Sequence, residues 1–339
     1  METVKPEGRS SSRGALLSDY ALLSDRAKGC MAAVAVGDAM GDIGRSEEHR
    51  RLYGIVTDMY EGAKSTDDTE FAVLTARTVL DARGELSYEN VTRAWHRYIL
   101  DRGGMRARGG RPLYGAVENL RRGLSAPRSG EDNVLNNDDG AAMRIAPIGI
   151  VFAGDPERAG AAAAVEAAVS HKESGIWAAQ AIAAGVAVAM TGAEAEAIEE
   201  AIFAFIPPES WLGRSMDRAR QLCRGANSVE EIWQAIHVDF FTPEHAVVEE
   251  ALPQSYAISR LTGANYRQGM FWATNFGRDA DTIGAIVGAI AGARHGLGAI
   301  PPDWVEPVRR PAGTCLGFAA DEDVLDLGEE LARLAVEVG

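Results

Sequence analysis

Cysteine is scarce in this chain, and its scarcity limits the class of protein. The three cysteines, Cys30, Cys223 and Cys315, are odd in number and far apart among the 339 residues. A secreted disulfide framework needs cysteines that can pair at suitable spacings. We therefore expect reduced thiols and a cytoplasmic protein.

A membrane span and a secretion signal are missing as well. The longest apolar stretch, residues 175–193, is rich in alanine and glycine and contains Gln180, which favours a buried helix over a transmembrane one. Residues 1–14 are polar and lack the apolar segment of a signal peptide. We expect these residues to form a disordered leader, and residues 15–339 to form a single domain.

Positive charge is outweighed by negative charge. Lysine and arginine number 34 against 49 aspartates and glutamates, so the formal net charge is −15. This balance argues against nucleic-acid backbones and anionic membranes as partners. An anionic substrate would need a metal ion or local basic residues to offset the repulsion. The rest of the composition, 46% hydrophobic and 24% charged, is that of an ordinary globular protein.

Strand patterns are nearly absent, and apolar residues recur at helical spacing along almost the whole chain. Small residues are frequent in 159–193 and 280–299, where they allow helices to approach closely. No repeat at solenoid periods is visible. We predict an all-α fold, a single compact multi-helix bundle, with an irregular segment at 124–141. The expected helices are 15–41, 67–83, 87–101, 112–123, 142–152, 156–170, 174–191, 193–204, 210–223, 228–237, 243–258, 262–275, 281–296 and 322–337.

Two acidic triplets, far apart in the chain, are its most informative feature. Thr66-Asp67-Asp68 and Asp279-Ala280-Asp281-Thr282 each open an apolar helical run. If the two helices pack side by side, four carboxylates and two hydroxyls converge, and such a cluster needs a cation. Oxygen ligands suit hard ions, so we predict a metal centre for two divalent ions. The alternative is that each triplet simply caps its helix.

Further motifs occur in a recognisable order. They are Gly37-Asp38-Ala39-Met40-Gly41, the first triplet, Asp139-Gly140-Ala141-Ala142-Met143-Arg144, Ser170-His171, the segment EALPQ at 250–254, and DADTIGAIVGAIAGA, which begins with the second triplet. In this ordered set, from about residue 30 to 307, the chain resembles the ADP-ribosylglycohydrolase family. The resemblance implies an all-helical fold, two divalent ions (Mg²⁺ or Mn²⁺), and hydrolysis of the glycosidic bond at the anomeric carbon of a ribose.

The resemblance also assigns roles to residues. The metal ligands fall on Thr66, Asp67, Asp68, Asp279, Asp281 and Thr282, the residues already chosen from their chemistry. Substrate contacts are expected from Asp139, Gly140, Ala141, Ala142 and His171. For proton transfer we expect a metal-activated water oriented by Asp68, with Asp38 in support. Structural alternatives are a helix end for Asp38, a loop-to-helix transition at 140–142, and a core position for His171.

The chain departs from the family pattern near the expected substrate groove. Family members usually carry a glutamate shortly after the first motif, and Arg45 takes its position here. Arg278 replaces a glycine before the second triplet, and residues 106–111 are rich in arginine. We expect Arg278 and this stretch to help an acidic protein bind an anionic substrate, the alternative being a solvated basic loop. Other carboxylates that could serve in place of the glutamate are Asp42, Glu47 and Glu48.

Three functions remain open at this point. The first is hydrolysis of ADP-ribose from a protein side chain. The second is hydrolysis of a nucleoside, nucleotide or other small ribosylated metabolite. The third is a non-catalytic role, as a ligand-binding or crystallin-like structural relative, and the presence of all six expected metal ligands argues against it.

Overall fold

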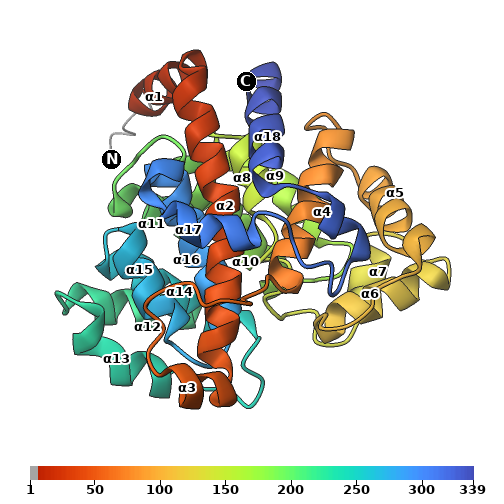
Figure 1. The fold of residues 1–339 in the computed structure, drawn as a ribbon. Coiled ribbons are helices and arrows are strands. Elements are labelled where there is room, and N and C mark those ends of the chain that lie inside the picture. Colours follow the sequence, from red (N-terminus) through yellow and green to blue (C-terminus); the bar gives the residue numbers. More distant parts are fainter. Residues whose placement is uncertain (1–6) are drawn as a thin grey trace.

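The computed structural model describes residues 7–339, and within them the fold is built from helices alone (Figure 1). The β-type pairing among these residues is an isolated bridge between Asp138 and Val247. The expected all-α fold is therefore confirmed. No helix in the described part of the chain is long and apolar enough to cross a membrane.

The α-helices within residues 7–339 are α1 (Glu7–Ser18), α2 (Tyr20–Arg45), α3 (Glu47–Tyr53), α4 (Asp67–Asp81), α5 (Tyr88–Tyr98), α6 (Arg111–Arg121), α7 (Arg128–Glu131), α8 (Ala146–Val151), α9 (Pro156–Ala167), α10 (Ser174–Ala189), α11 (Ala195–Phe203), α12 (Trp211–Arg224), α13 (Val229–Val238), α14 (Val248–Leu261), α15 (Tyr266–Thr274), α16 (Ala280–His295), α17 (Pro302–Val305) and α18 (Val324–Val338). Short 3₁₀ helices are η1 (Leu100–Arg102), η2 (Leu297–Ala299), η3 (Glu306–Val308) and η4 (Gly317–Asp321).

Helices α2 and α16 form the centre of the molecule and pack against each other more extensively than any other pair. Their glycines let the two backbones touch. A Cβ atom added to Gly37 would lie 2.1 Å from the carbonyl oxygen of Gly284, and one added to Gly284 would lie 2.4 Å from that of Gly37. The small residues noted in the sequence thus serve close helix packing. The contact also brings the end of α2 beside the start of α16.

The remaining helices surround this pair. Helix α4 and the C-terminal helix α18 pack against α2 on one side, whereas α14 and α15 pack against α16. Figure 1 shows α2 running through the middle of the molecule, with α4 to α7 to one side and α11 to α15 to the other. Because α4 and α16 both begin near the lower half of α2, their N-termini can share one site.

The N-terminal region differs from its prediction. The helix expected at 15–41 is interrupted at Asp19, whose side chain accepts a hydrogen bond from Leu22 N and caps α2. Helix α1 begins at Glu7, so residues 7–14 of the expected disordered leader are helical. Burial of Leu16 and an ion pair of Arg13 with Asp155 hold this helix on the bundle. Residues 1–6 of the leader lie outside the described residues.

Three expected helices begin four or five residues later than predicted. Helix α8 starts at residue 146 rather than 142, α14 at 248 rather than 243, and α15 at 266 rather than 262. For α8 and α14 the reason is a contact between the two preceding loops, in which Asp139 N donates to Ala246 O at 2.7 Å and Val248 N to Asn137 O at 3.2 Å. These backbone groups find partners across the loops instead of within helices. The same contact draws residues 138–140 and 244–246 towards one cavity.

Candidate metal centre and substrate cavity

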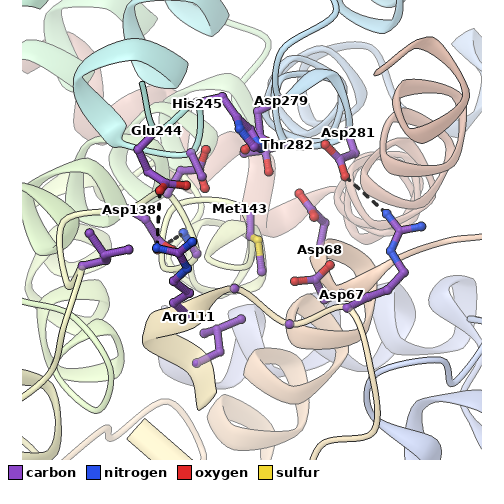
Figure 2. Close-up of a pocket in the computed structure, with 18 of the residues that line it drawn as sticks. Asp67, Asp68, Arg111, Asp138, Met143, Glu244, His245, Asp279, Asp281 and Thr282 are labelled. Atoms are coloured by element: carbon purple, nitrogen blue, oxygen red, sulfur yellow. Dashed lines mark hydrogen bonds and ion pairs between the residues drawn. The ribbon is translucent and has the colours of Figure 1, made fainter. Parts of the chain in front are cut away.

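The two acidic triplets face each other across a cavity of about 320 Å³. Asp67 and Asp68 line it from the start of α4, and Asp279, Asp281 and Thr282 from the start of α16. Figure 2 shows the first pair of carboxylates pointing towards the second group. The cavity is the place where four carboxylates converge.

Simple capping does not account for the triplets. Thr66 and Asp279 occupy the N-cap positions of α4 and α16, yet neither side chain makes a capping hydrogen bond to its own helix. Thr66 Oγ1 instead donates to Asp38 Oδ1 at 2.7 Å and lies 3.3 Å from Asp68 Oδ2. Thr66 is buried and is not part of the cavity wall.

Asp38 supports the first triplet from behind. This fully buried residue of α2 accepts hydrogen bonds from the backbone N–H groups of Thr66 (2.7 Å) and Thr69 (3.1 Å) and from both threonine hydroxyls. Asp38, Asp68 and Asp281 each offer a carboxylate oxygen within 4.8 Å of the others'. Asp38 does not line the cavity, and its supporting role stays a prediction.

Several carboxylate oxygens in this cluster have no hydrogen-bond partner. They are Asp68 Oδ1, Asp139 Oδ2 and Asp281 Oδ1, and all are buried. A buried carboxylate oxygen without a partner is costly, and a hard divalent cation is a suitable partner for several at once. The donor set therefore fits the kind of metal that the sequence suggests.

The pKa values of the carboxyl groups in the cluster shift in different directions. Burial, together with the neighbouring carboxylates, raises the pKa of Asp67, Asp68 and Asp139 well above the usual range. Burial and Asp279 raise the pKa of Asp281 to about 7. Burial would also raise the pKa of Asp279, but the hydrogen bond from His245 and the charge of Arg45 lower it to about 2. Protein cations thus compensate Asp279, whereas Asp67 and Asp68 have little compensation.

Arg45 is the cation closest to the cluster. Its Nη1 lies 3.2 Å from Asp279 Oδ1 and forms an ion pair with Asp281 Oδ2, while its Nη2 is 3.1 Å from His245 Nε2. His245 Nε2 is in turn 3.3 Å from Asp279 Oδ1. The sequence identified Arg45 as the residue at the glutamate position. His245 had no visible motif around it, because the loop that carries it reaches the site only through tertiary packing.

The arginine-rich stretch contributes two side chains to the cavity wall, Arg108 and Arg111. Arg108 pairs with both carboxylate oxygens of Asp42, at 2.6 and 3.1 Å, and lies 3.9 Å from Asp281. Arg111 is mostly exposed and lies 3.7 Å from Glu244 across the cavity mouth (Figure 2). Arg106 lies elsewhere and bonds to Gly313 O.

Arg278, expected to contact substrate, makes internal contacts in this structure. Its guanidinium donates to both oxygens of buried Glu250, at 2.5 and 2.9 Å, and to Thr242 O at 2.6 Å, and it lies over the ring of Phe241. It does not line the cavity. The buried carboxylate of Glu250 needs a cation, and Arg278 supplies it. In this structure Arg278 serves an internal ion pair, and the substrate contact expected for it stays a prediction.

The residues expected to contact substrate divide into two groups. Asp139 and Gly140 line the cavity, whereas Ala141 and Ala142 are buried and do not. His171 is also buried behind the wall, and its Nε2 lies 2.6 Å from Oδ1 of Asp138, which does line the cavity. His171 can therefore act on the cavity only through Asp138, a residue that sequence reasoning missed.

Further charged residues named in the sequence lie around the site or away from it. Arg144 pairs with Glu166 at 3.0 Å, and both side chains are fully buried. Glu47 is exposed at the start of α3 and pairs with Arg51, so it does not reach the cavity. Asp42 lines a neighbouring cavity of about 420 Å³, which Arg108 also lines. Arg108 is the residue that the two linings share.

The fold and this carboxylate site together define a class of helical glycohydrolases, and comparison with known proteins agrees. A model of the ADP-ribosylglycohydrolase family matches residues 19–338. The chain belongs to the ADP-ribosylglycohydrolase family. The resemblance drawn from the motifs is thereby confirmed.

Three comparisons illustrate the relationship. An uncharacterized protein of Archaeoglobus fulgidus is 30% identical, over 85% of this chain and 92% of its own. The ADP-ribosylarginine hydrolase Tri1 of Pseudomonas putida is 26% identical, over 90% of this chain and 79% of its own. Among solved structures, an ADP-ribosylglycohydrolase-related protein complex has a TM-score of 0.63 at 24% identity and covers 92% of this chain and 99% of that one, which shows the shared fold.

Proposed function

We propose that this protein is a metal-dependent hydrolase that cleaves the glycosidic bond between an ADP-ribosyl group and its acceptor. Family membership supports an ADP-ribosyl glycohydrolase. The observation that carries the proposal is the cluster of buried, unpartnered carboxylate oxygens of Asp68, Asp139 and Asp281 at a cavity that arginine side chains also line. Carboxylates in such a setting suit a cation, and guanidinium groups suit phosphate.

The residues that would hold a divalent ion such as Mg²⁺ or Mn²⁺ are those of the two triplets. When bound, such an ion supplies an acidified water and a charge that orients ribose hydroxyls. We assign the orientation of the attacking water to Asp68, because its carboxylate lines the cavity at the first triplet. Asp38 keeps Asp68 in position through Thr66 and Thr69.

The cavity walls support an anionic ribosyl substrate. Arg108 and Arg111 can pair with phosphate oxygens, and Gly140 lines the same cavity. The second cavity, beyond Arg108, gives room for the acceptor. We place arginine first among the acceptors, because relatives include the ADP-ribosylarginine hydrolase of Pseudomonas putida. A further relative is an ADP-ribosyl-[dinitrogen reductase] glycohydrolase of Rhodospirillum rubrum, which is 24% identical over 83% of this chain.

The location of the protein is a smaller part of the proposal. All three cysteines are free and buried. This state agrees with a reducing compartment, so we propose the cytoplasm.

A substrate panel tests the function. Chelator-treated protein is supplied with Mg²⁺ or Mn²⁺ and incubated with ADP-ribosyl-arginine, ADP-ribosyl-serine and nucleosides, and the released sugar is measured. We expect metal-dependent release of ADP-ribose from ADP-ribosyl-arginine by the native protein, and much slower release by the Asp68→Asn variant. Release from nucleosides alone would shift the proposal to small ribosyl compounds. Binding of ADP-ribose without hydrolysis of any substrate would indicate a non-catalytic relative.

A further inference from the structure

Arg45 is an unusual neighbour for a metal centre, because it brings a fixed positive charge into the ligand cluster. It is the last residue of α2, and its side chain is only 29% exposed. The guanidinium contacts Asp281 Oδ2 and lies 3.2 Å from Asp279 Oδ1. It therefore binds one carboxylate oxygen from each acidic residue of the second triplet.

The backbone that carries Arg45 is held close to the site. The preceding residue, Gly44, packs directly on the end of α15, since a Cβ atom added there would lie 1.6 Å from the carbonyl oxygen of Thr274. Gly41 packs in the same way against Ala280, at 2.1 Å from its carbonyl oxygen. The end of α2 thus lies directly against α15 and α16, and this places the guanidinium within reach of both carboxylates.

The contacts of Arg45 divide the cluster into two parts. Asp279 Oδ1 is shared by Arg45 and His245, and Asp281 Oδ2 pairs with Arg45. Asp281 Oδ1 and Asp68 Oδ1 have no partner, and neither has Asp139 Oδ2. Arg45 and His245 therefore compensate the charge of Asp279, whereas Asp68 and the free oxygen of Asp281 still require a cation.

We propose that the Arg45 guanidinium occupies one of the two cation positions of the centre, so that the site binds a single divalent ion between Asp68 and Asp281. This inference rests on the metal dependence of the proposed function and departs from the two ions expected from the sequence. A second divalent ion at Asp279 would have to displace Arg45 and approach His245, and like charges at such distances repel. By taking the place of one cation, Arg45 limits the number of divalent ions that the centre binds.

The stoichiometry of Mn²⁺ binding tests the inference. Chelator-treated full-length protein is titrated with Mn²⁺ by isothermal calorimetry, and the bound Mn²⁺ is examined by electron paramagnetic resonance. We expect one ion per chain and the spectrum of an isolated Mn²⁺ in the native protein. The Arg45→Ala variant should bind two ions and show the spectrum of a coupled pair. Arg45→Lys, which keeps the charge, should bind one.

Arg108→Ala is the matched control, because Arg108 lines the same cavity but pairs mainly with Asp42. It should bind one ion, as the native protein does. Two ions in the native protein, or one in a folded Arg45→Ala variant, would overturn the inference and leave the proposed hydrolase intact. No ion bound to the native protein would reject both. If Arg45→Ala does not fold, the number of Mn²⁺ ions bound per chain by the native protein and by Arg45→Lys still tests the inference.

Discussion

At the scale of single residues, the chemistry of the site depends on which carboxylate oxygens the protein itself satisfies. Asp38 is saturated by hydrogen bonds from Thr66 and Thr69, and Asp279 by Arg45 and His245. Asp68 and Asp281 each keep one buried oxygen without a partner. These two residues are consequently the ones whose substitution should affect metal binding most directly.

Divalent metal should stabilise the native protein, and Asp281→Asn should remove most of that effect. A ligand that binds only the folded state adds about 2.7 kcal/mol when its concentration is a hundred times its dissociation constant. Thermal unfolding of chelator-treated protein with and without Mn²⁺ measures the shift. Asp217→Asn, on the exposed face of α12, is the control and should keep the full shift. An unchanged midpoint for the native protein at millimolar Mn²⁺ would contradict a metal centre.

Asp68→Asn should lower the turnover number by about 10²–10⁴, the usual contribution of general acid–base groups. The physical reason is that an amide cannot accept a proton from the attacking water. Steady-state kinetics on ADP-ribosyl-arginine at saturating metal give the number. Glu47→Gln should leave turnover unchanged, because Glu47 is exposed and pairs with Arg51. Near-normal turnover in Asp68→Asn, together with loss of turnover in Glu47→Gln, would mean that the proton-transfer glutamate has shifted along the chain to position 47.

At the scale of elements, the site depends on the contact between α2 and α16. The two helices are close enough for the Gly37 and Gly284 backbones to touch, and this contact sets the distance between Arg45 and Asp281. Helix α18 packs on the far end of α2 and is joined to it by a small polar cluster around Glu329. Both contacts can be tested separately from the chemistry.

Gly37→Ala should destabilise the protein by about 1–3 kcal/mol, the range for overpacking a core. The new methyl would lie 2.1 Å from a carbonyl oxygen of α16, so the helices must separate. The free energy of unfolding in urea measures the loss. Gly298→Ala adds a methyl with no atom within 4 Å and should change stability by less than about 0.5 kcal/mol. Equal effects at both positions would refute a packing role for Gly37.

Glu329 should make stability depend on pH in the acid range. Hydrogen bonds from Lys28, Ser24 and Tyr20 lower the pKa of Glu329 from 4.5 to about 2 in the folded protein. Because the folded pKa lies below the unfolded one, this contribution is fully present above about pH 4.5 and is lost as the pH falls towards 2. Unfolding midpoints over this range should fall less steeply for Glu329→Gln than for the native protein. Parallel curves for the two proteins would show that the contacts of Glu329 do not contribute to the pH dependence of stability.

At the scale of the whole molecule, an acidic chain has to admit an anionic substrate. The net charge of −15 repels phosphate, whereas Arg108 and Arg111 place positive charge at the cavity. Several other arginines, Arg278 among them, serve internal ion pairs instead. Local rather than overall charge therefore determines which ligands the cavity accepts.

Arg111→Ala should raise the Michaelis constant for a phosphorylated ribosyl substrate by about tenfold or more, since hydrogen bonds to charged groups contribute about 1.5–3 kcal/mol. The dephosphorylated analogue should be affected much less, and the difference should shrink at high salt. Arg122→Ala, an exposed residue that does not line the cavity, is the control. Equal increases for both substrates would remove the charge argument and favour a nucleoside-like substrate.

The helical fold and the two triplets could be predicted because their signals are local. Helical periodicity, the alanine and glycine content of 280–299, and carboxylates at the start of an apolar run all depend on residues near one another in the chain. The order of the motifs then identified the family. The predicted starts of α8 and α14 were too early, because the loops before these helices pair with each other and such pairing has no local signal in the sequence.

Local patterns along the chain were enough to identify the helical class, the family and the carboxylates of the two triplets. The charges that accompany these carboxylates depend on the packed fold. Arg45, His245 and Asp138 reach the cavity because α2, the loop before α14 and the loop before α8 meet there, whereas Arg278, next to Asp279 in sequence, turns away to buried Glu250. The physical reason is that a side chain pairs with the nearest buried opposite charge in space, and that distance exists only once the helices have packed.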